Sequence, residues 1–593
     1  MLGVVAVVGG AGILLLRDIP GRSLACPAQT VSVTVVGSPD AAPLLQRAAR
    51  AFTRGHPRVN GRCVAIRVAS KPSGDAARAL AAGWNSDSDG PRPDVWSPSS
   101  SLWAGLLQQR LQAGQQPNML PAERPRLASS PLVVAMPRPM AVALGWPAHP
   151  IGLGDLLGMA QRGSHWRQFG HPDWGPFLYG KTDPNNSSPA LEAVLATFDL
   201  AARQAGHGAP SPQTLADRQV QASALAVARA PGPFARDPAT FLADLQQADE
   251  AGGGLGYVSA VPLDEKSVLD FNLGNPSGDP AQAGRHPRPK VPLAAVYPKE
   301  GTLVADHPYL VLSATWVDGP KRRAAADFLR FLHSAPVQND FKAAGFRSFT
   351  GAAGPLATVE NGVLPGQPTA VLPAPQPAVT DAALQAWNAA RVRGNTLAVI
   401  DVSSSMATSV PGTGKTRLAL ATAAAGHALS LLDDQDFVGV WATAAGLDGS
   451  RDYKQIVALG ALGQDMGDGR SRRQAISDGL NQLRAGGDSA LNDATLAAYQ
   501  FMQAHFVTGR VNTVVLLSDG RNDRSAGLSL PVLLEQLKVG QQSRPVRVVT
   551  IADGPDADTS ALAQIADVTG GAFYSAANPA TIGGVFVKAV TTF

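Results

Sequence analysis

The sequence has little of what marks the more specialised classes of protein. Only 16% of its 593 residues are charged, and lysine and arginine form no run of the kind that nucleic-acid binding needs. No segment repeats at the period of a solenoid. The GxSxG elbow, the HExxH metal motif and a catalytic Cys–His spacing are also missing. These absences argue against a nucleic-acid-binding protein, a repeat protein and a hydrolase, and we expect a protein that is not an enzyme.

Cysteine is scarce as well, with only Cys26 and Cys63 in the chain. Each precedes a β-branched run, VSVTVV from Val31 and VAIRV from Val64. If these runs are neighbouring parallel strands, both thiols lie at the same end of a sheet. A bond between them would then stabilise the fold by roughly 3–4 kcal/mol and would require an oxidising compartment. We therefore predict a Cys26–Cys63 disulfide, with two unrelated buried thiols as the alternative.

The apolar run at the start of the chain, Leu2–Leu16, is short for a membrane span. As a helix it would reach roughly 22 Å, whereas the hydrocarbon core of a bilayer is roughly 30 Å thick. We interpret residues 1–25 as a signal peptide or a membrane anchor, with a buried N-terminal strand or helix as the alternative. Together with the predicted disulfide, this leader indicates a protein at the cell membrane that faces outside, or a secreted protein.

The chain is too long for one hydrophobic core, so we expect two or three domains. Over residues 26–350 short apolar strands alternate with helical stretches, which is the pattern of an α/β fold. Residues 351–390 are rich in proline, which favours an extended, semi-rigid linker. The alternation then resumes, and we predict that residues 391–593 form one doubly wound α/β domain with a parallel sheet.

Oxygen-bearing side chains follow the predicted strands of this last domain. They are Asp401, Ser403 and Ser405 after one apolar strand, Ser489 in a glycine-rich turn before a helix, and Asp519 after the strand VVLLS. In an open parallel sheet these places lie at the carboxyl ends of strands, where ligands bind. Oxygen is the donor that Mg²⁺ and Ca²⁺ prefer, so the pattern predicts a metal site. A serine-rich turn whose hydroxyls only cap the next helix is the alternative.

With these segments, residues 390–593 resemble the von Willebrand factor type A family, whose metal-dependent adhesion site uses D-x-S-x-S, a later Thr and a later Asp. The resemblance implies that Ser403 and Ser405 bind Mg²⁺, or Ca²⁺ or Mn²⁺, directly. It implies that Asp401 and Asp519 hold the metal directly or through water. As in that family, the metal would then bind an acidic group of a protein partner.

The closing stretch IADGPDADTSALAQIADVTGGAFYSA (551–576) adds to this resemblance, and two positions depart from it. Ser404 stands where the family often has Gly, and Ser489 stands where Thr is usual. Serine keeps the hydroxyl of threonine but lacks the methyl that restricts its rotamer. The second departure therefore bears on the metal affinity of the site rather than on its identity.

A second motif, PGTGKT at 411–416, is similar to a phosphate-binding loop. That loop requires a glycine at the position of Ser409 and follows its strand directly, whereas DVSSSMATSV fills the turn here. We therefore favour an exposed loop before a helix that begins at Arg417 over an ATP site.

The first domain resembles the periplasmic solute-binding proteins of the two-lobed type over residues 31–347. The segments that carry the resemblance are GSPDAAPLLQRAARAF (37–52), GKTDPNNSSPALEAV (180–194), AVYPKEGTLVADHPYLVL (295–312) and the helix that ends in KAAGFRS (342–348). The resemblance implies two α/β lobes with a cleft between them.

Serine-rich turns that follow a strand and open a helix are the candidate solute contacts in this cleft. Ser38, Ser100 and Ser188 each lie at such a turn, where free N–H groups and the helix dipole suit an anionic or polar solute. Thr182 and Tyr257 are expected to add hydroxyl groups. Helix capping alone is the alternative role for each serine.

Both domains together predict an extracytoplasmic, membrane-associated recognition protein. We expect metal-dependent protein binding through the second domain and binding of a small polar or anionic solute in the first. The membrane contact would be the N-terminal apolar segment, and no nucleic-acid partner is expected. The alternative is the solute receptor of an ABC-type transport system, in which the second domain serves for docking.

Overall fold

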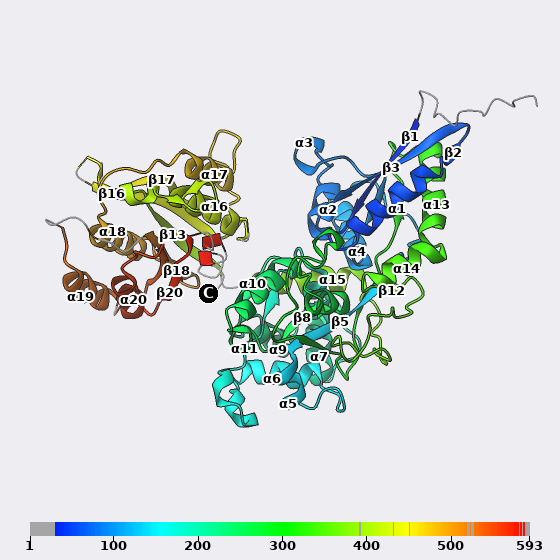
Figure 1. Ribbon diagram of the computed structural model, residues 1–593, viewed down its shortest axis with the longest axis horizontal. Helices are drawn as coiled ribbons and strands as arrows, with labels where there is room; N and C mark the ends of the chain where they lie inside the picture. The colour runs from blue at the N-terminus through cyan, green and yellow to red at the C-terminus, as the bar shows by residue number, and fades with distance from the viewer. Residues whose placement is uncertain are drawn as a thin grey trace, which may run out of the picture.

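The computed structural model shows two α/β units, each with its own hydrophobic core (Figure 1). It describes residues 30–390, 393–430, 432–449, 451–518, 522, 527–541, 543–579, 582–583 and 585–586. Each cluster of buried apolar side chains among these residues draws its members from one side of residue 390 only. The predicted leader, together with Cys26 and Asp519, lies outside the described residues.

The first lobe of the first unit is a five-stranded sheet with helices on both faces. Its elements are β1 (Thr30–Gly37), α1 (Ala42–Arg54), β2 (Arg58–Val59), β3 (Arg62–Ser70), α2 (Ser73–Ala81), α3 (Ser86–Asp89), β4 (Val95–Ser97), α4 (Ser101–Ala113), β11 (Leu310–Val311), α13 (Gly319–Leu332) and α14 (Ala335–Ala343). The strand order is β11-β4-β1-β3-β2. The apolar residues Leu44, Leu45 and Ala48 recur at helical spacing and bury one face of α1 against the sheet.

β1 and β3 pair in parallel, so the two β-branched runs that follow the cysteines are neighbouring strands, as predicted. Cys63 lies opposite Thr30 in this register and is 2% exposed. No cysteine among the described residues is free. Because Cys26 lies outside those residues, its bond to Cys63 stays a prediction.

The second lobe is built around one long, wholly buried strand. Its elements are β5 (Ala128–Pro137), α5 (Arg138–Ala143), α6 (Leu153–Gln161), β6 (Lys181–Thr182), α7 (Ser188–Gln204), α8 (Pro212–Leu215), α9 (Arg218–Ala228), β7 (Phe234–Ala235), α10 (Pro238–Glu250), α11 (Gly254–Tyr257), β8 (Val261–Asp264), α12 (Glu265–Asn272), β9 (Leu293–Val296), β10 (Val304–Ala305) and β12 (Arg347–Ser348). β5 is the central strand, which pairs antiparallel with β8, β9, β10 and β12. The two-lobed α/β architecture is therefore as predicted.

Residues 351–390 differ from the extended linker that their proline content predicts. They fold back onto the first unit, where Leu372 and Ala370 bond the backbone of Thr302 at 2.8 and 3.1 Å. Helix α15 (Pro377–Ala390) then packs against α4 of the first lobe and α7, α8 and α9 of the second. Its buried side chains Val379, Ala383, Leu384 and Trp387 join the core that α4 and α7 share. The prolines do not prevent this, because a proline at the first position of a helix is favourable.

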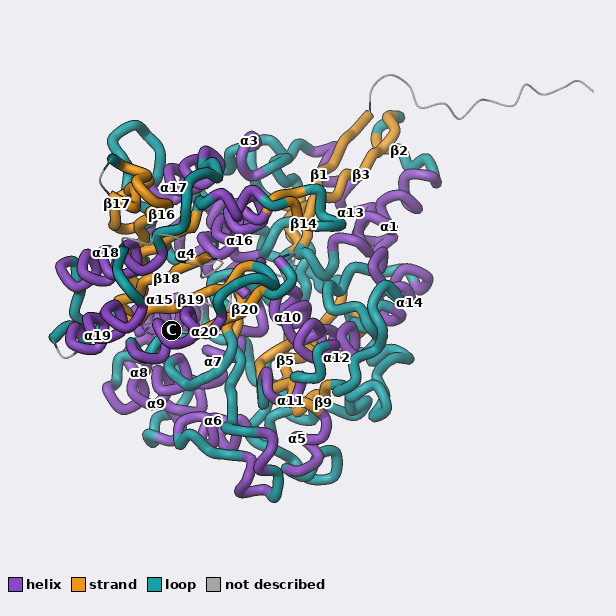
Figure 2. Tube along the Cα trace, turned by 60° about the vertical axis from the view of Figure 1, so that its left-hand side comes forward, coloured by secondary structure: helices purple, strands orange, loops and turns teal. Residues whose placement is uncertain are grey.

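The second unit is a doubly wound sheet, as predicted, with helices on both faces (Figure 2). Its elements are β13 (Gly394–Asp401), β14 (Ser409–Val410), β15 (Lys415–Thr416), α16 (Arg417–Leu429), β16 (Phe437–Asp448), β17 (Arg451–Ala461), α17 (Arg472–Gln482), α18 (Leu491–Ala504), β18 (Val511–Ser518), α19 (Leu530–Gly540), β19 (Arg547–Asp553), α20 (Thr559–Val568) and β20 (Phe573–Ala576). The strand order is β17-β16-β13-β18-β19-β20, and only the edge strand β17 runs antiparallel. α16 and α17 cover one face, and α18, α19 and α20 cover the other.

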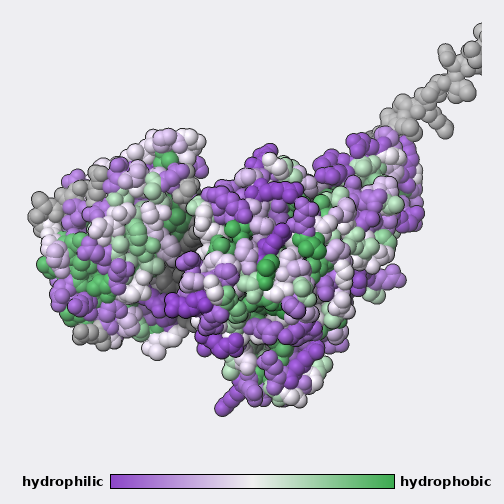
Figure 3. Space-filling model, turned by 60° about the horizontal axis from the view of Figure 1, so that its bottom comes forward, coloured by the Kyte–Doolittle hydropathy of each residue, from purple (hydrophilic) through white to green (hydrophobic). Residues whose placement is uncertain are grey.

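The surface of the described part is mainly hydrophilic, with smaller hydrophobic patches between the polar residues on the face that Figure 3 shows. Within that part of the chain, no helix combines the length and the apolar character that crossing a bilayer requires. The apolar segment that we interpret as a leader precedes the described residues.

Candidate functional site

The carboxylate of Asp401 lies at the centre of the predicted metal site. Asp401 ends β13, beside the end of the parallel strand β18, and is 1% exposed. Its Oδ1 accepts a hydrogen bond from the backbone N–H of Ser403 at 2.8 Å. Its Oδ2 accepts from the hydroxyls of Ser518 at 2.5 Å and Ser489 at 3.5 Å. Three segments that are distant in sequence therefore meet at this one side chain.

The D-x-S-x-S turn docks on the glycine-rich turn that precedes α18. Ser404 donates both its backbone N–H and its hydroxyl to the carbonyl of Gly487, each at 2.8 Å. Gly486 donates in return to the carbonyl of Val402 at 2.7 Å. Gly487 has a φ of +83°, which a glycine adopts without strain. Ser404, at the position where the von Willebrand factor type A pattern often has Gly, therefore ties the two turns together.

The hydroxyls of Ser403 and Ser405 lie 3.1 Å apart. Adjacent ligands of an octahedral Mg²⁺, each about 2.1 Å from the ion, are about 3.0 Å apart. The pair is therefore spaced as two neighbouring ligands of such an ion would be. Ser403 is buried and Ser405 is half-buried, so the second hydroxyl lies nearer to solvent.

The donors of this site are mainly hydroxyl groups. Asp401 is its one described carboxylate, and Asp519, which follows Ser518 directly, lies outside the described residues. Within the described ranges, no three histidine, cysteine, aspartate or glutamate side chains are grouped so that they could hold a metal ion. Hydroxyl and carboxylate oxygens fit a hard cation such as Mg²⁺.

The PGTGKT stretch forms the turn and the second strand, β15, of a hairpin whose first strand is β14, instead of a phosphate-binding loop. Gly412 and Gly414 in its turn have φ angles of +77° and +66°. The Thr416 hydroxyl caps α16 by accepting from the N–H of Ala419 at 3.2 Å. The stretch is thus a turn before the helix that begins at Arg417, as predicted.

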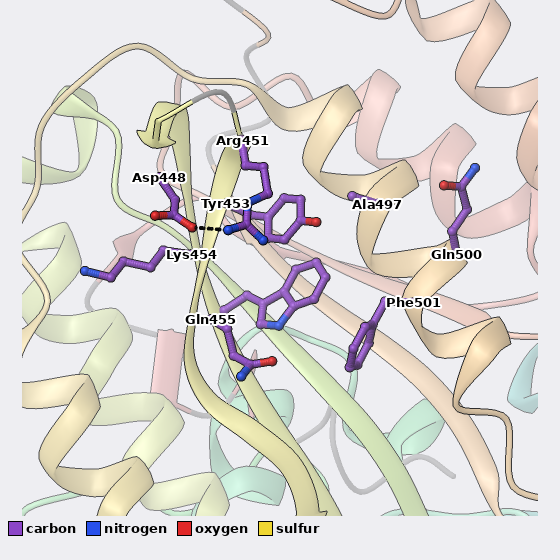
Figure 4. A pocket seen from close by; sticks show the side chains of 9 residues that line it. Asp448, Arg451, Tyr453, Lys454, Gln455, Ala497, Gln500 and Phe501 are labelled. Carbon is purple, nitrogen blue, oxygen red and sulfur yellow. Dashed lines mark ion pairs between the residues drawn. The ribbon is translucent and has the colours of Figure 1, made fainter.

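A groove of about 600 Å³ lies between the β16–β17 hairpin and α18 (Figure 4). The rings of Trp441 and Tyr453 stack there with centroids 4.2 Å apart, and Phe501 lies 5.0 Å from Trp441. Arg451 and Asp448 form an ion pair at 2.7 Å on the rim. None of the residues that line this groove belongs to the predicted metal site.

In the first unit, serine hydroxyls from both lobes meet beside the loop that follows β4. The Ser99 hydroxyl lies 3.1 Å from that of Ser73 and 2.5 Å from that of Ser188. Trp103 donates its indole N–H to the Ser188 hydroxyl at 2.7 Å. The predicted contact Ser188 is therefore held against the first lobe by hydrogen bonds.

The other predicted solute contacts occupy different positions. Ser38 donates its backbone N–H to the carbonyl of Ser97 at 3.0 Å, which places it beside the same loop. Ser100 caps α4, with its hydroxyl 3.4 Å from the N–H of Leu102. Thr182 bonds the hydroxyl of Ser187 at 2.8 Å. Tyr257 lies on α11, where its ring contacts Phe241, and burial raises the pKa of its phenol.

A cavity of about 330 Å³ lies between the lobes. The residues that line it are Ser100, Ser101, Leu102, Arg126, Ser129, Pro131, Glu192, Leu303, Val304, Asp306, Arg347, Gly351, Pro368, Val371, Leu372 and Ala374. Sequence reasoning identified only Ser100 among them. Glu192 lies on α7 and is fully buried, although a glutamate in a helix is usually a surface residue. The one local signal was its position within the apolar run ALEAVLATF.

Charged pairs line the second lobe next to this cavity. Arg347 donates two hydrogen bonds to the Glu265 carboxylate, at 2.9 and 2.7 Å, and Tyr297 donates its hydroxyl to the same group. Burial lowers the pKa of Arg347, but the hydrogen bonds and charge of Glu265 outweigh burial and raise it. Lys266 and Asp270 form a second buried pair. No sequence motif predicts these ion pairs, because only the fold brings their members together.

The model of the bacterial extracellular solute-binding proteins matches residues 33–347. No curated protein sequence matches the chain. Among solved structures, a von Willebrand factor type A protein from Catenulispora acidiphila is 20% identical, with a TM-score of 0.27, and the match covers 34% of this chain and 42% of that one.

Two further structures are similar to parts of the chain. The ferric binding protein from Campylobacter jejuni is 10% identical over 60% of this chain and 99% of its own, with a TM-score of 0.36. The proximal thread matrix protein 1 of the mussel byssus, solved with a zinc-occupied MIDAS motif, is 14% identical over 34% of this chain and 48% of its own, with a TM-score of 0.26. Since the family model spans more than half of the 593 residues, the protein belongs to the bacterial extracellular solute-binding proteins.

Proposed function

We propose that the protein recognises a partner protein through a divalent cation held by its second unit. The observation that carries this proposal is the convergence of Ser403, Ser489 and Ser518 on the buried carboxylate of Asp401. The 3.1 Å spacing of the Ser403 and Ser405 hydroxyls supports it, because it matches adjacent ligands of Mg²⁺. With Asp519 as the second carboxylate, the site would offer only two negative charges.

Hydroxyl ligands leave much of the positive charge of the metal uncompensated. An acidic group of the partner would complete the coordination shell and make binding of metal and partner mutually favourable. Mg²⁺ is the expected ion, with Ca²⁺ or Mn²⁺ as substitutes. The family is an extracellular one, so the protein acts outside the cytoplasm. Attachment to the membrane through residues 1–25 is part of the proposal.

The test is calorimetric titration of the full chain with Mg²⁺ and Mn²⁺. We expect Asp401→Ala to weaken metal binding by at least about tenfold, because it removes a charge and the acceptor of three hydrogen bonds. Asp488→Ala is the matched control, since Asp488 is an exposed carboxylate next to Ser489. Pull-down of extracellular proteins with and without chelator then tests partner capture. Capture that neither chelator nor Asp401→Ala changes would contradict the proposal.

For the first unit we propose binding of a small polar solute between the lobes. The cavity of about 330 Å³, which residues of both lobes line, favours this role. It equally suits the alternative function, the solute receptor of an ABC-type transport system. Thermal-shift screening distinguishes the two. A specific small solute at micromolar concentration favours transport, whereas metal-dependent protein capture without any solute favours recognition.

A further inference from the structure

The cavity between the lobes is built from three separate parts of the chain. Ser100 begins the α4 region of the first lobe, Glu192 lies on α7 of the second, and Leu372 belongs to the segment that follows the second lobe. That segment is fixed in place, because Ala370 and Leu372 bond the backbone of Thr302. Helix α15 packs against both α4 and α7, and Figure 1 shows it beside α4. Residues of both lobes and of the segment that follows the second lobe therefore line the cavity.

Glu192 is a buried carboxyl group on the wall of this cavity, and within the described part of the chain it lacks a hydrogen-bond partner. Its side chain is 0% exposed, and neither carboxylate oxygen has a hydrogen-bond partner among the residues that the structure describes. The Ser100 hydroxyl lies near enough to lower the pKa of the carboxyl, but not in hydrogen-bonding geometry. A buried carboxyl group without a partner is costly, so such groups are normally neutral or bound to a cation.

The charges around Glu192 favour a cation over an anion. Burial raises the pKa of Glu192 well above its usual range, and the negative charges of Asp264 and Asp306 raise it further. Of the two arginines on the cavity wall, Arg347 is paired with Glu265, and Arg126 is exposed.

The wall also carries apolar side chains that a hydrocarbon chain could contact. Pro131, Leu303 and Leu372 line it beside the acidic residues. Asp306 already accepts a hydrogen bond from the N–H of Ser101 at 2.7 Å, which leaves its second oxygen for another donor. The wall of the cavity thus offers the acceptors Glu192 and Asp306 together with several apolar side chains.

We propose that this cavity binds a small alkylamine, whose ammonium group pairs with Glu192 and donates to Asp306 and Ser100 while its carbon chain contacts the apolar wall. This inference rests on the proposed solute binding and names the class of solute. The helix N-termini suggested an anionic solute, whereas this inference names a cationic one. Binding of the amine ionises Glu192, whose proton is released to solvent.

The probes for the test are methylammonium, butylammonium and putrescine, which all carry N–H donors, with sulfate and phosphate as anionic counterparts. Each is added to the full chain at about 10 mM, and we expect the amines but not the anions to raise Tm by about 2–4 °C. Calorimetry with putrescine in two buffers of different ionisation heat should show proton release. Stabilisation by sulfate or phosphate alone would refute the cationic class while leaving solute binding intact. No stabilisation by any amine would overturn the inference.

Glu192→Gln should weaken amine binding by a factor on the order of 30. Glutamine has the shape of the neutral carboxyl group, so the unliganded protein is expected to fold. Glu250→Gln, which changes an exposed glutamate of the same lobe, is the matched control.

As a second variant, Val371→Lys places a competing cation at a position of the cavity wall that is 60% exposed. Amine binding that both Glu192→Gln and Val371→Lys leave unchanged would show that this cavity is not the site. Chelator should have no effect, which separates this test from that of the metal site.

Discussion

Ser404 stands where the von Willebrand factor type A pattern often has Gly, and its side chain makes a contact of its own. Its hydroxyl bonds the carbonyl of Gly487 and points to the neighbouring turn. We expect Ser404→Gly to leave Mg²⁺ affinity within about twofold and to lower the free energy of unfolding by about 1–2 kcal/mol, because a hydrogen bond is lost and a glycine is introduced. Calorimetry and urea unfolding measure the two effects. A tenfold loss of Mg²⁺ affinity would instead make Ser404 part of the metal site.

Glu192 leads to a pH-dependent stability difference. Because its pKa is raised in the folded protein, the neutral carboxyl stabilises the fold at low pH, and this contribution is lost as pH rises through the raised pKa. Glutamine does not titrate, so the Glu192→Gln variant does not lose stability in this way as pH rises. We therefore expect the unliganded variant to gain stability relative to the original protein between pH 5 and pH 8, measured by urea unfolding. A difference that does not change with pH would show that Glu192 is already ionised in the fold.

The predicted metal site and Glu192 differ in how far their residues can be identified from the sequence. Asp401, Ser403 and Ser405 belong to one short motif, and the structure brings them to Ser489 as the strand order requires. Glu192 could not be identified, because its burial depends on packing against segments far away in the chain. The position of a residue is predictable when it follows from the residue's neighbours in sequence.

At the scale of elements, the alternation of strands and helices in both units was predicted from apolar periodicity, whereas helix α15 was not. Proline content is a local signal, whereas the burial of α15 depends on the complementary faces of α4 and α7. Pro377 even packs close to Gly105, where a Cβ would lie 3.3 Å from the proline ring. The proline content of residues 351–390 therefore predicted an extended linker, whereas tertiary contacts determine the structure of this segment.

Trp387 tests whether α15 is a structural part of the first unit. It is 8% exposed and lies in the core that α4 and α7 share. We expect Trp387→Ala to lower the free energy of unfolding of the first unit by about 3–5 kcal/mol, because a large buried ring is removed. Gln385→Ala, on the exposed side of the same helix, is the control and should change it by less than about 0.5 kcal/mol. Equal effects in urea unfolding would mean that α15 is only loosely attached.

At the scale of the molecule, α15 connects the two units as well as the two lobes. It contacts helices of both lobes and ends at Ala390, four residues before β13 begins at Gly394. β13 in turn ends at Asp401. The strand that leads to the predicted metal site is therefore attached to both lobes together, and not to one of them alone.

The contact between the lobes gives a test of how they are held together. A Cβ added at Gly74 would lie 1.9 Å from the carbonyl oxygen of Asn185, which belongs to the other lobe. Around this contact Arg78 donates to the same carbonyl at 3.1 Å, and Arg236 forms an ion pair with Asp75 at 2.8 Å. A methyl group cannot fit against this backbone, so Gly74→Ala should move the lobes apart at a cost of about 1–3 kcal/mol.

We expect the Gly74→Ala variant to have a larger radius of gyration by small-angle X-ray scattering and a weaker affinity for amines. Gly256→Ala is the matched control, because a Cβ at Gly256 meets nothing within 4 Å. The metal affinity of the second unit should be the same in both variants, since the change affects only the first unit. If Gly74→Ala leaves both the radius of gyration and amine binding unchanged, the two lobes are not held together through α2, and solute affinity does not depend on this contact.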